Sequence, residues 1–130
     1  MTRHLAVLRE PYLSRILAGE KTIESRFLRV RAAPYGCVTA GDTLFLKRAS
    51  GPIVATARAA RVVMFDDLTP ARVAALLERY AGGLRLDDDM RARAQSSRYA
   101  VLIWLTDVAP ISDPPLVSKR DRRAWVVLES

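Results

Sequence analysis

Three charged side chains close together are the part of this sequence best suited to chemistry. Lys21, Glu24 and Arg26 stand in the octet 19–26, a segment that would otherwise be typical of a buried strand. An amine beside a carboxylate in a partly dry cleft can pass a proton or hold a phosphate. The alternative is an ion-pair cluster on the surface of an edge strand, which would contribute little to stability. The role of the octet therefore depends on the elements that position it.

A short helix should end directly before the octet. Residues 11–18 are predicted to be helical, because Pro11 suits a first helical turn and Tyr12 and Ile16 begin an apolar face at four-residue spacing. Gly19 follows, at the place where a helix commonly ends in a left-handed residue. We therefore expect a positive φ at Gly19.

The second half of the octet should begin a strand. From Thr22 the apolar pattern has a period of two, which puts Glu24 and Arg26 on one face and Ser25 on the other. The two charges on one face lie within reach of each other. Lys21 lies in the turn itself, so strand parity does not give its direction.

The rest of the chain predicts one α+β domain over residues 1–130. Apolar runs predict further strands at 3–8, 43–48, 53–63, 99–106 and 125–128. Thr69 and Pro70 are typical of a helix start, and Gly82-Gly83 is expected to end that helix. The acidic run 87–89 should open a shorter helix through about Ala94. Strands in this number, with helices inserted between them, suit a closed barrel.

Composition indicates a basic protein with no membrane span. The formal net charge is +7 and the pI is ≈ 10.3, and arginine supplies nearly all of the excess. This balance is typical of nucleic-acid binding, although arginine-rich chains also arise from GC-rich genomes. One cysteine, Cys37, excludes an internal disulfide, and no apolar run is long enough for a membrane span or a signal peptide. We therefore expect a cytoplasmic protein.

The octet also resembles the motif of a known family. The pattern Gly-x-Lys-x-x-Glu-x-Arg is present as Gly19, Lys21, Glu24 and Arg26, and Gly41-Asp42 precedes the next strand. In this arrangement the chain resembles the ASCH family of PUA-like domains, and segments 8–12, 99–104 and 125–128 extend the similarity over most of its length. The resemblance implies a PUA-like β-barrel of about six strands with two or three short helices. It also implies a cleft for a nucleic acid or a nucleoside, into which we expect Lys21 to point.

Two activities found in that family bear on the octet. Some small ASCH proteins are amidohydrolases of 4-acetylcytidine, but their nucleophilic threonine falls at Glu24 here, and a carboxylate cannot take that role without changing the intermediate. Other members are implicated as ribonucleases that combine the lysine with a serine before the late core strand. Ser96 or Ser97 could occupy that place, although two serines in a loop are otherwise unremarkable. The resemblance thus implies Lys21, Glu24 and Ser96 as candidate catalytic residues.

Basic and aromatic residues outside the octet could extend a ligand site. Arginine-rich loops bind phosphates without reading sequence, and aromatic rings offer stacking faces for unpaired bases. The candidate ligand-binding residues are Tyr12, Lys21, Glu24, Arg26, Arg29, Arg31, Lys119, Arg120, Arg122 and Arg123. The loop arginines have an alternative as solvated surface residues, and Tyr12 has one as part of the core.

No cofactor and no metal ligand set is predicted. His4 is the only histidine, so a histidine-based metal site cannot be built. The acidic run 87–89 could hold Mg²⁺, but its place in the first turn of a helix explains it adequately. A divalent metal would be expected only of a nuclease.

The sequence is compatible with three functions. The first is a module that binds RNA, most of all single-stranded RNA, or a modified nucleoside. The second is an enzyme of the same fold, either a ribonuclease or a nucleoside amidohydrolase. The third is a structural or interaction module, in which the arginine excess is compositional.

Overall fold

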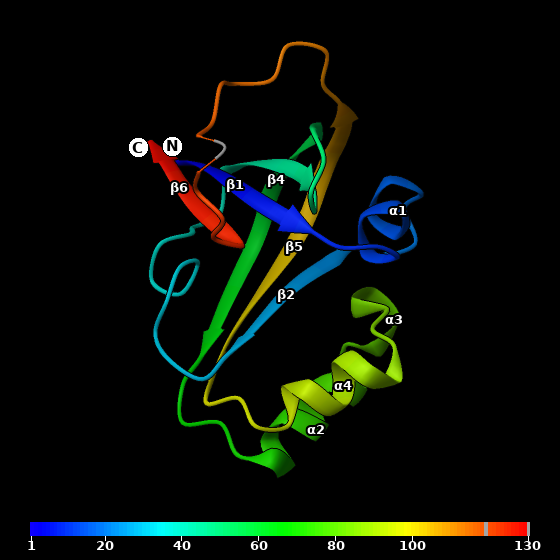
Figure 1. The fold of residues 1–130 in the computed structure, drawn as a ribbon. Helices are drawn as coiled ribbons and strands as arrows, with labels where there is room; N and C mark the ends of the chain where they lie inside the picture. The colour runs from blue at the N-terminus through cyan, green and yellow to red at the C-terminus, as the bar shows by residue number, and fades with distance from the viewer. Residues whose placement is uncertain (119, 130) are drawn as a thin grey trace.

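A single six-stranded sheet organises the protein. The computed structural model describes residues 1–118 and 120–129, and Figure 1 shows its strands and helices. The strands are β1 (Arg3–Leu8), β2 (Ile23–Leu28), β3 (Thr43–Arg48), β4 (Ile53–Phe65), β5 (Tyr99–Pro110) and β6 (Trp125–Glu129), in the spatial order β2-β5-β4-β3-β1-β6. β1 and β3 are parallel, and the other neighbouring strands are antiparallel.

The sheet is a curled half-barrel. The register between β4 and β5 shifts twice, between Thr56 and Arg58 and again between Ala59 and Arg61. Such irregularities bend a strand and increase its twist, so they curl the sheet. The α+β class and the six strands are confirmed, but the closed barrel is not, because β2 and β6 are the two ends of the sheet order and do not pair in the described chain. β4 and β5 are longer than predicted, because the two strands stay hydrogen-bonded to each other over nearly their full lengths.

Four helices accompany the sheet, rather than the two or three expected. They are α1 (Tyr12–Leu17), α2 (Pro70–Arg79), α3 (Ala81–Leu84) and α4 (Asp88–Ala94). Figure 1 shows α2, α3 and α4 gathered at one end of the sheet, with α1 following β1. None of the helices described is long and apolar enough to cross a membrane.

The starts of α2 and α4 are the predicted ones. The Thr69 side chain accepts a hydrogen bond from the Arg72 N–H at 3.2 Å, and Pro70 is the first helical residue. The Asp87 carboxylate accepts the Met90 N–H at 2.9 Å. Both caps satisfy backbone donors that a helix start leaves free.

The helix end predicted at Gly82-Gly83 is wrong. α2 ends at Arg79, and the two glycines form the middle of α3. A Cβ atom on Gly83 would lie 2.5 Å from Ile23 Cδ1, whereas one on Gly82 would have no neighbour within 4 Å. Gly83 is therefore present because α3 packs directly against the start of β2, where the Thr22 N–H donates to the Gly83 carbonyl at 3.0 Å.

Apolar side chains fill both faces of the sheet. One core inside the curl contains Leu44, Val101 and Ile103, and a second core lies between the sheet and α2, α3 and α4. Ala100 and Leu102 belong to the second core, so β5 is buried on both faces, as its continuous apolar sequence predicted.

A buried polar chain ties β1 to its two neighbours. His4, at 0% exposure, meets Asp42 Oδ2 at 2.8 Å through Nε2, and its Nδ1 accepts the Trp125 indole N–H at 3.1 Å. Burial acts to raise the pKa of Asp42, but hydrogen bonds from Thr39, His4 and Thr2 outweigh it and lower the pKa. The only histidine is thus a structural link between the start of β3 and β6.

Candidate functional site

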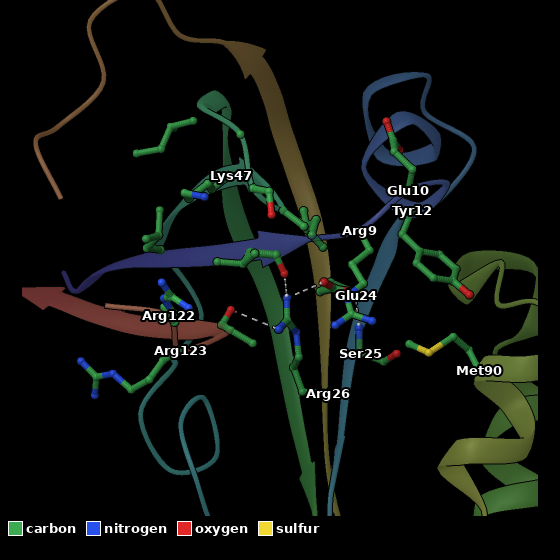
Figure 2. A pocket seen from close by; sticks show the side chains of 18 of the residues that line it. Arg9, Glu10, Tyr12, Glu24, Ser25, Arg26, Lys47, Met90, Arg122 and Arg123 are labelled. Carbon is green, nitrogen blue, oxygen red and sulfur yellow. Dashed lines mark hydrogen bonds and ion pairs between the residues drawn. The ribbon is translucent and has the colours of Figure 1, made fainter. Parts of the chain in front are cut away.

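A large cleft lies along β2, which is an edge strand. Its volume is about 1330 Å³. Five parts of the chain line it: the end of β1 with the turn into α1, then β2, the β3–β4 turn, the α4 region and the segment before β6. Figure 2 shows Glu24 and Arg26 at the centre of this cleft, with Tyr12 on the α1 side and Arg122 and Arg123 on the β6 side.

Lys21 does not point into the cleft, contrary to expectation. It is 2% exposed and is not among the residues that line the cleft. Its Nζ donates to the Leu84 carbonyl at 2.6 Å, lies 3.7 Å from Glu24 Oε1 and sits 5.5 Å from the centre of the Tyr12 ring. The amine is therefore enclosed behind the cleft wall, while Glu24 remains beside it as predicted.

The turn after α1 explains why Lys21 points inward. Gly19 has the predicted positive φ, +78°, and both the Glu20 and Lys21 N–H groups donate to the Arg15 carbonyl. The chain thus turns sharply into β2 and places the lysine between α1 and α3. Burial lowers the pKa of Lys21, Glu24 acts in the opposite direction, and the guanidinium of Arg26 lowers it further.

Glu24 is the acidic group at the floor of the cleft. It is 6% exposed; its Oε1 accepts the Ser25 N–H at 2.9 Å, and its Oε2 accepts Arg26 Nη2 at 3.1 Å. An ionised carboxylate has about four acceptor positions, so Glu24 retains capacity for a hydrogen bond from a ligand. Ser25 also lines the cleft, and Figure 2 shows its side chain directed toward Met90, away from Arg26, as strand parity predicted.

The guanidinium of Arg26 is held mainly by hydrogen bonds within the protein. Its Nη2 donates to the Val7 carbonyl at 2.9 Å as well as to Glu24, and its Nη1 donates to the Ala124 carbonyl at 3.2 Å. Its guanidinium also lies 5.2 Å from the centre of the Trp125 ring. Trp125 is 3% exposed, so it belongs to the core and offers no stacking face. Arg26 lines the cleft and joins β2 to β1 and to the start of β6.

Tyr12 forms part of the wall on the α1 side. It lines the cleft but is 8% exposed, and its hydroxyl oxygen accepts the Asp87 N–H at 3.4 Å. Burial raises the pKa of Tyr12, so its hydroxyl stays protonated. The ring lies over the Lys21 amine. Tyr12 is therefore both a residue of the cleft wall and a buried core residue, the two roles that the sequence left open.

The basic segment before β6 divides into residues that line the cleft and one that does not. Arg122 and Arg123 line it, whereas Arg120 is exposed outside it. Arg123 binds Asp121 through two nitrogens, at 3.0 Å and 2.7 Å, and these hydrogen bonds lower the pKa of Asp121 to about 2. Lys119 lies outside the described residues.

Ser96, Arg29 and Arg31 lie away from the cleft. Arg29 donates to the Ser96 hydroxyl at 2.9 Å, and the Arg31 guanidinium lies over the Tyr99 ring. Arg29 follows the end of β2, whereas Lys21 precedes its start, and a strand of this length spans roughly 17 Å. The structure therefore does not bring Ser96 together with Lys21 and Glu24.

Arg9 lines the cleft although sequence reasoning did not select it. It is exposed, and within residues 1–118 and 120–129 its side chain has no hydrogen-bond or ion-pair partner. Figure 2 shows its guanidinium beside Ser25 and Glu24. Its place between the first strand and Pro11 was the available signal, because that turn leads directly to Tyr12. Among the described residues no three His, Cys, Asp or Glu side chains gather as they would around a metal ion.

The fold is that of an ASCH domain. The chain is similar to the crystal structure of a tyrosine-to-phenylalanine mutant of the ASCH protein from Zymomonas mobilis, with a TM-score of 0.73 and 17% identity over 99% of this chain and 91% of that chain. A serine-to-alanine mutant of the same protein gives a TM-score of 0.67 at 17% identity, covering 98% and 88% of the two chains. Another structure of ASCH from Zymomonas mobilis gives 0.62 at 20% identity, covering 83% and 69%.

Sequence comparison alone adds nothing to these structural likenesses. No protein-family model and no curated protein matches the sequence. The resemblance seen in the octet and the three-dimensional similarity nevertheless agree on an ASCH fold, which in this structure is a curled α+β half-barrel.

Proposed function

We propose that this ASCH domain is cytoplasmic and that it binds RNA or a modified nucleotide in the cleft along β2. The observation that carries the proposal is a cleft of about 1330 Å³ with Tyr12, Glu24 and Arg26 in its wall and floor. Pockets for small molecules usually measure roughly 300–1,000 Å³, so this one has room for more than a single compact ligand. These three residues, all predicted from the octet and its flanks, thus line the same cleft.

Glu24 is the residue that would recognise a base. Its carboxylate is oriented by the Ser25 N–H and Arg26, and it faces the cleft with acceptor capacity left. The exocyclic amine of a cytosine or adenine is a donor that such a group accepts. Lys21 would act through Glu24, since its amine lies 3.7 Å from Glu24 Oε1 and helps to hold the carboxylate in place.

Charge supports an anionic ligand. The chain carries a formal net charge of +7, and Arg9, Lys47 and Arg122 line the same cleft. Among the described residues five carboxylates also line it, and four of them are paired with arginines: Glu10, Glu24, Asp89 and Asp121. Basic residues around a cleft raise the local concentration of a nucleic acid and its association rate.

The geometry favours a binding domain over the two enzymatic alternatives. The position of the amidohydrolase nucleophile is occupied by Glu24, a carboxylate held by two hydrogen bonds. The serine considered for a ribonuclease, Ser96, accepts a hydrogen bond from Arg29 outside the cleft. Turnover of labelled RNA or 4-acetylcytidine, with and without Mg²⁺, would instead favour an enzyme.

The test is a binding measurement on the wild-type chain with a fluorescein-labelled single-stranded RNA of roughly ten nucleotides. We expect fluorescence anisotropy to report binding that weakens steeply between roughly 50 and 200 mM salt. Glu24→Gln should weaken it by roughly ten-fold, because a neutral amide oxygen accepts a weaker hydrogen bond than a charged carboxylate. A parallel titration with 4-acetylcytidine tests the nucleoside.

The matched control is Asp107→Asn, which neutralises an exposed carboxylate at the far end of β5 and should leave affinity unchanged. Absence of both RNA and nucleoside binding at the lowest salt would refute the proposal. Equal affinities of Glu24→Gln and Asp107→Asn, with normal thermal midpoints, would remove Glu24 from the site.

A further inference from the structure

Most charged side chains around the cleft already have partners within the protein. Arg26 binds two carbonyls and Glu24, Arg123 binds Asp121, and Arg93 lies 3.1 Å from Asp89. The rim pair Glu10 and Arg48 is also engaged, and Lys47 donates to the Arg48 carbonyl at 3.2 Å. A ligand that binds these groups would have to share their positive charge with the partners they already have.

Two arginines of the cleft differ from the others. Arg9 and Arg122 line the cleft, both are exposed, and neither has a hydrogen-bond or ion-pair partner among residues 1–118 and 120–129. Figure 2 shows Arg9 on the α1 side of Arg26 and Arg122 on the β6 side. The floor formed by Glu24 and Arg26 therefore lies between two unpaired guanidinium groups.

A guanidinium suits a phosphate better than any neutral part of a nucleoside. It presents a planar fork of donors that matches phosphate oxygens and remains charged at every physiological pH. A single unphosphorylated nucleoside seated on Glu24 would offer no phosphate to Arg9 and would leave Arg122, on the other side of Arg26, unused. A single-stranded RNA that crosses the cleft floor would place one phosphate near Arg9 and another near Arg122, while one of its bases faces Glu24.

We infer that Arg9 and Arg122 are phosphate-binding residues, and that the ligand of the cleft is a single-stranded RNA rather than a free nucleoside. This inference rests on the proposed function, and it narrows the class of ligand. The two arginines supply affinity and fix the orientation of the RNA backbone in the cleft, and Glu24 supplies the contact to a base.

The experiment compares the salt dependence of RNA binding in Arg9→Gln, Arg122→Gln and the double variant, with the same labelled RNA. For single strands each phosphate contact contributes a slope of about 0.7 in the plot of log affinity against log salt concentration. Each single variant should therefore reduce the slope by about 0.7, and the double variant by about 1.4. Arg91→Gln is the matched control, because Arg91 is an exposed arginine of α4 outside the cleft lining.

A second pair of variants separates charge from folding. Arg9→Lys and Arg122→Lys keep the positive charge and should restore most of the slope. Thermal midpoints of all variants should match the wild type, since both side chains are exposed. A loss of slope that accompanies a fall in midpoint and is not restored by lysine would count against the inference.

The outcomes distinguish this inference from the proposed function. RNA binding with slopes equal to that of Arg91→Gln would overturn the phosphate assignment and leave RNA binding intact. Binding of 4-acetylcytidine without RNA binding would overturn the inference but keep the nucleotide-binding proposal. Binding of neither probe would overturn both.

Discussion

At the scale of single residues, Lys21 is unusual because lysine is almost never fully buried unless it is paired. Here it is 2% exposed, and its amine has a carbonyl and a carboxylate as partners. Lys21→Ala would leave a cavity, an unpaired Leu84 carbonyl and a less compensated Glu24. We expect it to reduce the free energy of unfolding by roughly 3 kcal/mol, measured by urea denaturation.

Two companion variants sharpen this prediction. Lys21→Met fills the same space without a charge, so it should cost less than Lys21→Ala. Glu20→Ala changes the exposed neighbouring residue and should stay within about 0.5 kcal/mol of the wild type. If Lys21→Ala also stayed in that range, the side chain would not be packed in solution and would face the cleft after all.

The pH dependence of Lys21 has a definite sign. Burial lowers its pKa in the folded protein, so between the folded and unfolded values the unfolded chain binds the proton more strongly. The cost of burying the charged amine is therefore fully present below the folded pKa, and it is relieved as pH rises from the folded pKa toward the unfolded value of about 10.4. The stability of the wild type relative to Lys21→Met should rise over that range.

Strand parity predicted part of the site at this scale. It placed Glu24 and Arg26 together on one face, because a period of two is fixed by backbone geometry. It could not give the direction of Lys21, which lies in a turn. Nor could it show that Arg26 would bind the carbonyls of Val7 and Ala124, since such contacts depend on how distant strands meet.

At the scale of elements, the contact between α3 and β2 positions the buried lysine. Gly83 approaches Ile23 so closely that a Cβ would lie 2.5 Å from Ile23 Cδ1, and Ile23 is itself buried. Gly83→Ala should move α3 away from β2 and reduce stability by about 1–3 kcal/mol. Gly82→Ala is the matched control, since nothing lies within 4 Å of its Cβ position and alanine favours a helix. Denaturation curves in which both variants had equal stability would contradict the close packing.

Elements with strong local signals were predicted well from the sequence. The strands followed from apolar periodicity, and the starts of α2 and α4 followed from their capping residues. α3 was missed because two glycines in four residues have poor helix propensity. Its helical form depends on packing against β2, which local sequence does not encode.

At the scale of the whole molecule, one side chain bridges the two ends of the sheet. β2 and β6 are its opposite edges, and Arg26 of β2 contacts Val7 in β1 and Ala124 just before β6. Figure 1 shows β2 and β6 separated, with β1 between them. The arginine thus supplies, through its side chain, part of the closure that a complete barrel makes with backbone hydrogen bonds.

Removing this bridge should loosen β6 before the rest of the sheet. Arg26→Met keeps much of the apolar stem but removes donors to Val7, Ala124 and Glu24. Because the Val7 N–H also donates to the Ala124 carbonyl at 2.9 Å, the start of β6 would then be held by fewer contacts. We expect faster amide hydrogen exchange in peptides from β6 and the end of β1, with no change in β4 and β5, which pair over most of their length.

Arg48→Met, which removes an exposed ion pair with Glu10 at the cleft rim, is the control and should leave β6 unchanged. Uniform acceleration across all strands would mean that Arg26 supports global stability only, and unchanged exchange in β6 would mean that the half-barrel closes without it.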